Sequence, residues 1–259
     1  MQLRRLLLAA LASAFAAFLL VGGVGAGRAQ GFSAEQRSEI EGIIRNYLLR
    51  NPEVLQDVMV ELEKRQSAAE ADKARAAVKS NAALLFESPR HAVVGNSKGD
   101  VTLIEFFDYN CGFCKRALAD LQDLIKDDSK LKVILKEFPV LGEGSVEAAR
   151  VAIAANMQDR GGKKYFDLHQ KLLASRGPVD KARALAVAKE VGLDVARLER
   201  DMASDEVKGT IAENMKLAEA LGLNGTPSYV VGNDVVIGAV GLDTLKQKVN
   251  WARCGQVAC

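Results

Sequence analysis

The sequence predicts an α/β fold. An inserted block of helices divides its strand-containing part into two pieces, and a separate helical segment precedes the whole domain. Three observations carry this prediction. Residues 101–138 contain two apolar runs rich in β-branched and aromatic residues, with one amphipathic helical pattern between them. Residues 143–222 have helical periodicity almost throughout. Strand-like runs return only at 228–237, before a final helical stretch.

Each element in this order has its own signal. Val101–Phe107 is almost wholly apolar, as a central buried strand is. A helix over about 112–127 and a second strand over 131–138, which ends before Pro139, complete a strand–helix–strand unit. The helical block breaks at Gly161-Gly162, Gly177-Pro178, Gly192 and Ser204. The last elements are two strands and a helix, at 228–231, 235–237 and 242–253. This order is that of a thioredoxin-type sheet with a helical insertion.

The first 29 residues have the organisation of a secretory signal peptide. Arg4 and Arg5 precede an apolar run over 6–21, and small residues follow as far as Ala29. A membrane anchor is the alternative interpretation, but the run is barely long enough, because a spanning helix needs about 20 apolar residues. We therefore expect cleavage near Ala29 and export to the periplasm.

Charge and cysteine content narrow the function further. Removing Arg4, Arg5 and Arg28 from the 35 basic residues leaves 32, against 33 acidic ones, so the strongly basic face typical of nucleic-acid binding is not expected. The four cysteines form two close pairs. An even number in an exported protein indicates disulfide chemistry. Close spacing favours a redox-active pair over a structural disulfide, because a disulfide that closes a short loop removes little entropy from the unfolded chain and so stabilises the fold little.

Residues 30–88 form a helical region ahead of the main domain. Ser33 and Gln36 make a capping box, and Asn51-Pro52 ends one helix and starts the next, with Asn51 as its cap. Both helices carry apolar stripes, at Ile40, Ile43, Ile44, Tyr47 and Leu48, and at Val54, Leu55, Val58, Met59 and Leu62. The stripes are expected to pack either on the main domain or on copies of themselves, and the long charged spacer at 63–79 favours self-association.

The candidate redox site is Cys111-Gly112-Phe113-Cys114, placed where a strand ends and a helix begins. A thiol there meets the positive end of the helix dipole and free backbone N–H groups, which stabilise its thiolate form. We expect Cys111 to be the exposed nucleophile and Cys114, one turn inside, to be the buried resolving thiol. A static disulfide or half a zinc site is the alternative, and zinc would need a second pair of ligands.

Residues 105–115, with the run EFFDYNCGFCK, closely resemble the active-site segment of the DsbA-like thioredoxin-fold oxidoreductases of the bacterial periplasm. The helical block at about 143–222 resembles the helical domain inserted in those proteins. Residues 40–55, which include YLLRNPEVL, resemble the N-terminal region of the ScsC (suppressor of copper sensitivity) proteins. The resemblance implies an N-terminal helical oligomerisation region over 30–88 and a DsbA-like thioredoxin domain over 89–259.

The resemblance also implies that Pro227 is cis and contributes to substrate binding. The run Gly225-Thr226-Pro227 stands just before a strand, where this family has a cis proline against the two cysteines. X-Pro bonds adopt the cis form far more readily than other peptide bonds. A cis proline exposes the backbone of Thr226, which can then pair with an extended substrate chain. An ordinary loop proline is the alternative.

Glu105 is the third catalytic candidate, because the family places an acidic residue there, beneath the second cysteine. A buried carboxyl group has a raised pKa and can take a proton from Cys114 as that thiol attacks. A strand-edge charge paired with a lysine is the alternative interpretation.

Phe113 stands where the strongest oxidants of the family have histidine, and a neutral ring adds no positive charge to the thiolate. Together with Gly112, and with Thr226 before the proline, it resembles the disulfide isomerases. We count Phe113 with Thr226 and Pro227 as substrate-binding candidates.

Cys254 and Cys259 close the chain, beyond a helix end with Gly255 in the C′ position. A structural or accessory disulfide, a transferring redox pair and metal ligation remain open for them. His91 and His169 are the only histidines, so we expect no histidine-based metal site, and we interpret His169 as a packing or surface residue.

The sequence thus predicts a periplasmic disulfide isomerase or reductase that acts on unfolded or misoxidised exported proteins without a cofactor. Isomerase work requires Cys111 to be kept reduced, and the ScsC resemblance implies a membrane thiol reductase as partner and a homo-oligomer, with a trimer favoured. A dithiol oxidase is one rival. A thiol-based copper-tolerance or copper-binding protein is another, against which the scarcity of histidine and methionine clusters argues. A holdase-like binding protein is the third.

Overall fold

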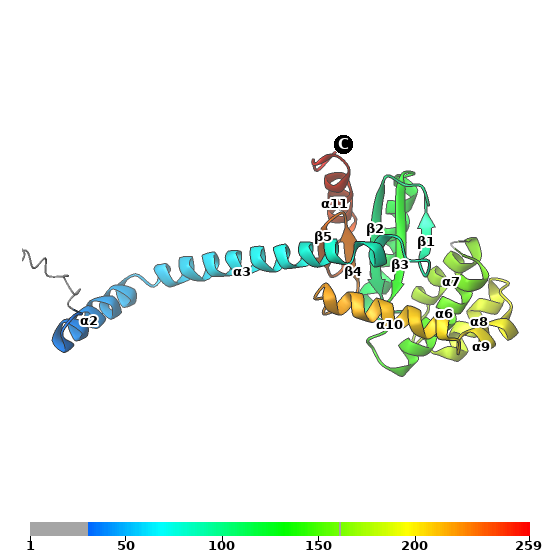
Figure 1. Ribbon diagram of the computed structural model, residues 1–259, viewed down its shortest axis with the longest axis horizontal. Helices are drawn as coiled ribbons and strands as arrows, with labels where there is room; N and C mark the ends of the chain where they lie inside the picture. Colours follow the sequence, from blue (N-terminus) through cyan, green and yellow to red (C-terminus); the bar gives the residue numbers. More distant parts are fainter. Residues whose placement is uncertain (1–30, 161) are drawn as a thin grey trace, which may run out of the picture. The chain divides into compact units, whose positions relative to one another are not determined.

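A computed structural model describes residues 31–160 and 162–259 of the chain (Figure 1). The predicted signal peptide at 1–29 lies outside the described residues. The chain divides into two compact units, residues 1–63 and residues 64–259.

The first unit contains helix α2 (Ala34–Arg50) and the beginning of helix α3 (Glu53–Ser80). The capping box is confirmed: the backbone N–H of Gln36 donates to Ser33 Oγ, and the backbone N–H of Ser33 donates to Gln36 Oε1. The prediction that Asn51 caps the second helix is wrong. Its backbone N–H and its side-chain Nδ2 both donate to the carbonyl oxygen of Tyr47, at 2.9 and 2.8 Å, so it satisfies a carbonyl at the end of α2.

The apolar stripes of α2 and α3 are largely in contact with solvent. No residue of α2 is buried. The exposed apolar side chains of the two stripes are Ile43, Ile44, Tyr47, Leu55, Val58, Met59 and Leu62. An apolar surface of this kind is typical of an interaction site, and its burial by self-association stays a prediction.

A five-stranded sheet forms the centre of the second unit, in the order β1-β3-β2-β4-β5. Its strands are β1 (Ala92–Gly95), β2 (Val101–Phe107), β3 (Leu131–Glu137), β4 (Ser228–Val231) and β5 (Asp234–Ile237). Strands β2 and β3 are parallel, and the other neighbours are antiparallel. The predicted strands are confirmed, and β1 is an additional short edge strand that pairs with β3.

Helices cover both faces of the sheet, which explains why β2 is apolar on both sides. On one face, Leu103 and Phe107 belong to a core shared with α5 (Gly112–Asp127) and α11 (Leu242–Cys254). On the other face, Ile104 and Phe106 pack with residues of α3, of α4 (Ala82–Phe86) and of α10 (Asp205–Ala220), which are Val78, Leu85, Leu217, Ala218 and Leu221. The end of α3 therefore belongs to the core of the second unit.

The inserted helical block has the predicted place in the chain. It contains α6 (Glu143–Gln158), α7 (Lys163–Leu173), α8 (Lys181–Glu190), α9 (Val195–Asp201) and α10. Figure 1 shows α6 to α9 gathered beside the sheet, while α10 returns the chain to β4. The α/β fold with a helical insertion is confirmed.

Candidate redox site

Cys111 lies at the junction between the central strand and the first helix of the sheet. Strand β2 ends at Phe107, and Cys111 is the N-cap residue of α5. Its backbone N–H donates to the carbonyl oxygen of Asp108 at 3.1 Å, which turns the chain from the strand into the helix. Cys111 and Cys114 are both free thiols in this structure. The structure therefore puts Cys111 at the amino end of a helix, as the sequence predicted.

The expectation that Cys111 is exposed is wrong. It is 6% exposed, against 0% for Cys114, and the Cys111 thiol donates to the carbonyl oxygen of Thr226 at 3.1 Å. The cover comes from a loop that lies more than a hundred residues away in the sequence. The side chain that does reach solvent between the two cysteines is Phe113, at 57% exposure.

The loop over Cys111 contains a cis peptide bond between Thr226 and Pro227, as the family resemblance implied. Ser228 Oγ donates to the carbonyl oxygen of Gly225 at 2.7 Å, and the carbonyl oxygen of Pro227 accepts a bond from the N–H of Gly238 at 2.8 Å. Strand β4 then begins beside β2. The backbone around Thr226 is thereby tied to the sheet at both ends and held against the thiol.

Glu105 is a buried carboxyl group in the middle of β2. It is 2% exposed, and its Oε2 atom has no hydrogen-bond partner among the described residues. Burial raises the pKa of Glu105 to about 8. Burial also raises the pKa of Cys114, and the charge of Glu105 raises it further. The ionised form of Glu105 therefore disfavours the thiolate of Cys114. The alternative of a strand-edge charge paired with lysine does not match this buried position.

Asp108 and Asn110 clamp the segment before Cys111 to two neighbouring loops. Asp108 accepts hydrogen bonds from the backbone N–H groups of Val140 and Leu141, at 2.9 and 3.0 Å, and from the Ser145 hydroxyl at 2.8 Å. The bond from the N–H of Asn110 to Asp108, at 2.8 Å, holds the turn itself. These bonds fix the loop after β3 beside the site.

Asn110 makes the second half of this clamp. Its side-chain Nδ2 donates to Ser145 Oγ at 3.0 Å and to the carbonyl oxygen of Val179 at 2.9 Å, and its Oδ1 accepts from the N–H of Val179 at 2.7 Å. The residue next to the nucleophile is thus bonded to the helical insertion. Sequence reasoning missed both clamp residues, although an aspartate and an asparagine just before a helix N-cap were a usable signal.

Tyr109 joins the same segment to a buried polar cluster. Its hydroxyl donates to Glu137 Oε1 at 3.2 Å, and the hydroxyl oxygen lies 3.4 Å from His169 Nδ1. Burial raises the pKa of Glu137 well above its usual value and lowers the pKa of His169 to about 3. Of the two interpretations of His169, packing is correct: its ring meets the edge of Phe107, with the ring centroids 4.6 Å apart. This histidine therefore anchors the insertion as a neutral side chain.

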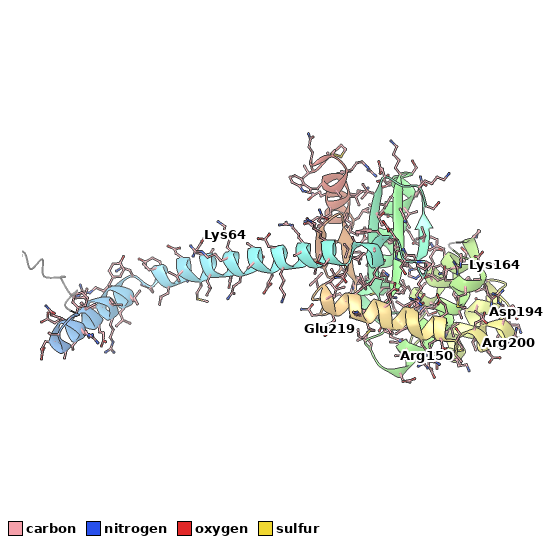
Figure 2. All side chains as sticks on the ribbon, viewed as in Figure 1. Lys64, Arg150, Lys164, Asp194, Arg200 and Glu219 are labelled. Atoms are coloured by element: carbon pink, nitrogen blue, oxygen red, sulfur yellow. A yellow bond between two sulfur atoms is a disulfide. The ribbon has the colours of Figure 1, made fainter. Side chains whose placement is uncertain are left out.

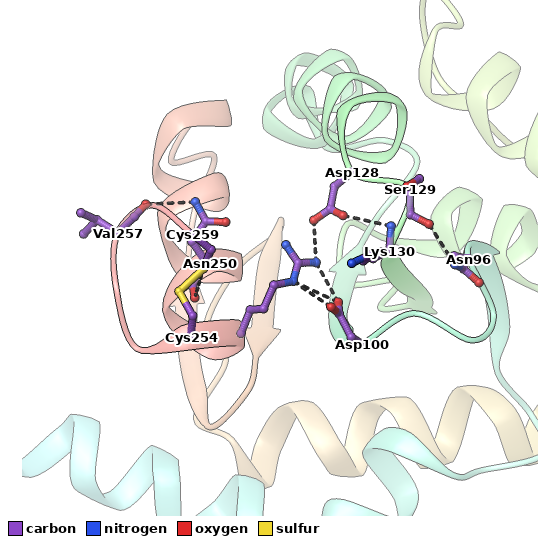
Figure 3. Close-up of polar contacts among 10 residues, drawn as sticks. Asn96, Asp100, Asp128, Ser129, Lys130, Asn250, Cys254, Val257 and Cys259 are labelled. Carbon is purple, nitrogen blue, oxygen red and sulfur yellow. Dashed lines mark hydrogen bonds and ion pairs between the residues drawn. A yellow bond between two sulfur atoms is a disulfide. The ribbon is translucent and has the colours of Figure 1, made fainter.

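Cys254 and Cys259 form a disulfide at the end of α11 (Figure 3). The tail folds back there because Gly255 takes a left-handed conformation and Asn250 Nδ2 donates to the carbonyl oxygen of Val257 at 3.0 Å. The neighbouring Arg253 binds Asp100, which directly precedes β2. The disulfide therefore lies near the amino end of β2, whereas Cys111 follows the carboxyl end of β2. The disulfide is thus separate from the candidate redox site.

Two further observations concern the described residues alone. Within residues 31–160 and 162–259, no group of three or more histidine, cysteine or acidic side chains is arranged to hold a metal ion. No helix in the same part of the chain is long and apolar enough to cross a bilayer.

Family models match two parts of the chain. Residues 102–250 match the DSBA-like thioredoxin domain, and residues 36–69 match the N-terminal domain of the copper resistance protein ScsC. The first match spans strands β2 to β5, the helical insertion and most of α11, and leaves out β1. The second covers α2 and the first part of α3, where the sequence had suggested ScsC.

Curated relatives include sodium/proton antiporters. The NhaA 1 antiporter of Salinispora arenicola is 25% identical over 166 residues, which make up 64% of this chain and 25% of the antiporter. The chain thus spans about a quarter of the length of the curated relatives that it matches, and we transfer no transport activity from them.

Solved structures resemble the chain over most of their own length. A thioredoxin-like oxidoreductase from Silicibacter pomeroyi is 45% identical, covering 66% of this chain and 96% of its own, with a TM-score of 0.63. ScsC of Proteus mirabilis in a transitional conformation is 27% identical, covering 87% and 98%, with a TM-score of 0.63. A periplasmic thioredoxin-like protein from Salmonella enterica serovar Typhimurium is 29% identical, covering 66% and 95%, with a TM-score of 0.61. The chain belongs to the DSBA-like thioredoxin domain family, and its residues 36–69 match the N-terminal domain of ScsC.

Proposed function

We propose that the chain is a disulfide isomerase or reductase of the periplasm, and that Cys111 and Cys114 carry the exchange. One observation supports this most strongly. The Cys111 thiol, at the amino end of α5, bonds the backbone of the cis-proline loop, while Glu105, whose Oε2 has no partner among the described residues, lies buried in the strand that precedes it. These observations support Cys111 as the nucleophile, the Thr226 backbone as the part that pairs with substrate, and Glu105 of β2 as the proton acceptor.

The proposed reaction begins with the thiolate of Cys111. It attacks one sulfur of a substrate disulfide, forms a mixed disulfide and releases the other substrate sulfur as a thiolate. In reduction, ionised Glu105 takes the proton of Cys114, and the Cys114 thiolate attacks the sulfur of Cys111. This step releases the second substrate sulfur as a thiolate and leaves the Cys111–Cys114 disulfide. In isomerisation, a different substrate thiol attacks the mixed disulfide instead, and Cys111 leaves as the thiolate. A carboxyl group whose pKa is about 8 is ionised in part of the folded molecules near neutral pH, and in that form it can accept the proton of Cys114 and later return it.

The isomerase direction rests on the surroundings of Cys111. Phe113 replaces the histidine of strong oxidants, and the residue before the cis proline is threonine. Such a protein needs Cys111 reduced, so we propose a membrane thiol reductase as its partner and unfolded or misoxidised exported proteins as its substrates. The predicted signal peptide and the periplasmic relative from Salmonella support the location.

The exposed stripes of α2 and α3 support self-association, and we propose a homo-oligomer, with a trimer favoured. An assembly would bring several Cys111 sites around one substrate. A substrate thiol released at one site would then meet the next site at high effective concentration, which suits reshuffling.

Two assays on the mature chain test the proposal. The reduced protein should accelerate insulin reduction and restore activity to a substrate with scrambled disulfides, and Cys111→Ala should abolish both. A Cys254→Ser/Cys259→Ser variant is the matched control, because it removes two sulfurs far from the site and should retain both activities. Full activity of Cys111→Ala would contradict the assignment. Net oxidation of reduced substrates without reshuffling would favour the dithiol oxidase.

A further inference from the structure

Arg116 lies over the dipeptide between the two redox cysteines. Its guanidinium carbon is 4.4 Å from the centroid of the Phe113 ring, a cation–π geometry. Its Nη1 atom is 4.0 Å from the position that a Cβ atom on Gly112 would occupy. One guanidinium group therefore covers both residues of the dipeptide, on the exposed side of the first turn of α5.

The segment that contains a second arginine, Arg176, is bonded to the same turn through Lys115. Lys115 Nζ donates to the carbonyl oxygens of Ser175 and Gly177, at 2.9 and 3.1 Å. Arg176 lies between these two residues and is exposed. Arg116 thus lies over the dipeptide of the redox pair, and Lys115 and Arg176 belong to the adjoining surface; we call these three residues the basic rim.

The stability of the fold does not account for Arg116. Positive charge in the first turn of a helix opposes the helix dipole. Among the described residues, neither Arg116 nor Arg176 has a carboxylate within ion-pair distance. Neighbouring Asp108 already accepts four hydrogen bonds, and Asp180 caps α8 through the N–H of Arg183. Glu143, at the start of α6, is the exposed acidic side chain of the nearby loop and forms no ion pair with the rim.

The stacked guanidinium is suited to binding a carboxylate. A guanidinium group that lies over an aromatic ring keeps its in-plane N–H donors free, and their fork matches the two oxygens of a carboxylate. The ring also limits the rotamers of the long side chain, so less entropy is lost when a ligand binds. Any substrate cysteine joined to Cys111 brings its flanking residues close to this group.

We propose that the basic rim, with Arg116 as its main residue, selects substrates that carry an aspartate or glutamate next to the cysteine under attack. The inference rests on the proposed exchange by Cys111 and names the substrate class of that same site. Electrostatic attraction of this kind raises the rate of association and weakens with salt. An acidic flank should therefore speed formation of the mixed disulfide.

The test uses three disulfide-linked, fluorescence-quenched peptides that differ only in the residues beside cysteine: glutamate, glutamine or lysine. The second-order rate of cleavage by the reduced full-length protein is measured at low and high salt. We expect the glutamate peptide to exceed the lysine peptide by about three- to tenfold, with the ratio falling at high salt. Arg116→Gln should bring the ratio close to one, and Arg116→Lys should retain part of it.

Arg200→Gln is the matched control, since it removes the same charge from the exposed surface of α9 in the helical insertion (Figure 2). It should keep the ratio of the unchanged protein. Equal rates for the three peptides, or an unchanged ratio in Arg116→Gln, would overturn the selection of acidic substrates while exchange itself stands. Absence of cleavage of every peptide would contradict the proposed function and, with it, this inference.

Discussion

Replacing Glu105 by glutamine should change the stability of the protein in a pH-dependent way, with a gain that appears as pH rises towards 8. Burial raises the pKa of Glu105 from 4.5 to about 8, so between these values the unfolded chain is ionised and the folded chain is protonated. The unfolded state then binds fewer protons, and the free energy of unfolding falls as pH rises, by about 1.4 kcal/mol per pH unit. The fall begins near pH 4.5 and is complete above about pH 8, where it amounts to about 5 kcal/mol.

The glutamine variant lacks this penalty at every pH. Its amide group adds a constant cost of about 1–3 kcal/mol, because it is buried where the carboxyl Oε2 has no partner among the described residues. The difference in unfolding free energy between the variant and the unchanged protein should therefore rise from pH 5 to pH 8 and then level off. Urea unfolding at several pH values measures it.

The slope with pH decides the outcome, because the amide cost does not vary with pH. Glu199→Gln, on the exposed face of α9, is the matched control, because it makes the same chemical change outside the core. A pH-independent difference between Glu105→Gln and the unchanged protein would refute the buried, proton-binding carboxyl group. It would also remove the basis for Glu105 as the proton acceptor of Cys114.

Three further predictions follow from the arrangement of the chain. Cys114→Ala should accumulate mixed disulfides with substrates, seen by mass spectrometry, since Cys111 still attacks but resolution is lost; rapid turnover without trapped species would contradict this. Replacing Cys254 and Cys259 by serine should lower the unfolding free energy by about 2 kcal/mol, the chain-entropy value for so short a loop, with exchange rates unchanged. Deleting residues 30–63, which leaves Val78 and Leu85 in their core, should give a folded monomer by light scattering that exchanges disulfides but does not reshuffle them; a monomeric full-length chain would refute the role of assembly.

Elements with strong local patterns could be predicted closely from the sequence. Strand β2 is buried on both faces, so its sequence is a continuous apolar run, and this run predicted the observed bounds. Helix α5 is buried on one face, so its sequence is amphipathic, and this pattern also predicted the observed bounds. Strand β1 could not be found in this way. It has four residues and ends at Gly95, and only its pairing with β3 makes it a strand.

The position of Asn51 shows a second limit. A residue between two helices can serve the end of one or the start of the other, and the same side chain suits both tasks. The sequence favoured a cap for the following helix, whereas the side chain bonds back to Tyr47. The choice depends on three-dimensional geometry, which propensity does not contain.

In the candidate site, the sequence motif predicted the chemical groups well but predicted their three-dimensional surroundings poorly. The run around the two cysteines indicated the redox pair directly, and its resemblance to the DsbA-like family implied the cis proline and a role for Glu105. The burial of Cys111 was not, because the covering carbonyl oxygen of Thr226 lies 115 residues further along the chain.

The clamp and the polar cluster were missed for the same reason. Tyr109 meets Glu137 across 28 residues and His169 across 60, and Asn110 meets Val179 across 69. Such partners become visible only when the insertion is folded onto the sheet.

The most direct test of the central claim is the redox equilibrium of the Cys111–Cys114 pair in glutathione buffers, followed by alkylation and mass spectrometry. The Cys254→Ser/Cys259→Ser background keeps the second pair out of the measurement. The account predicts a reversible two-electron couple with a potential near the value of about −180 mV found for protein disulfide isomerase. A pair that forms no reversible disulfide would contradict the assignment of the site, and a potential near −120 mV, typical of a strong dithiol oxidase, would contradict the isomerase or reductase role.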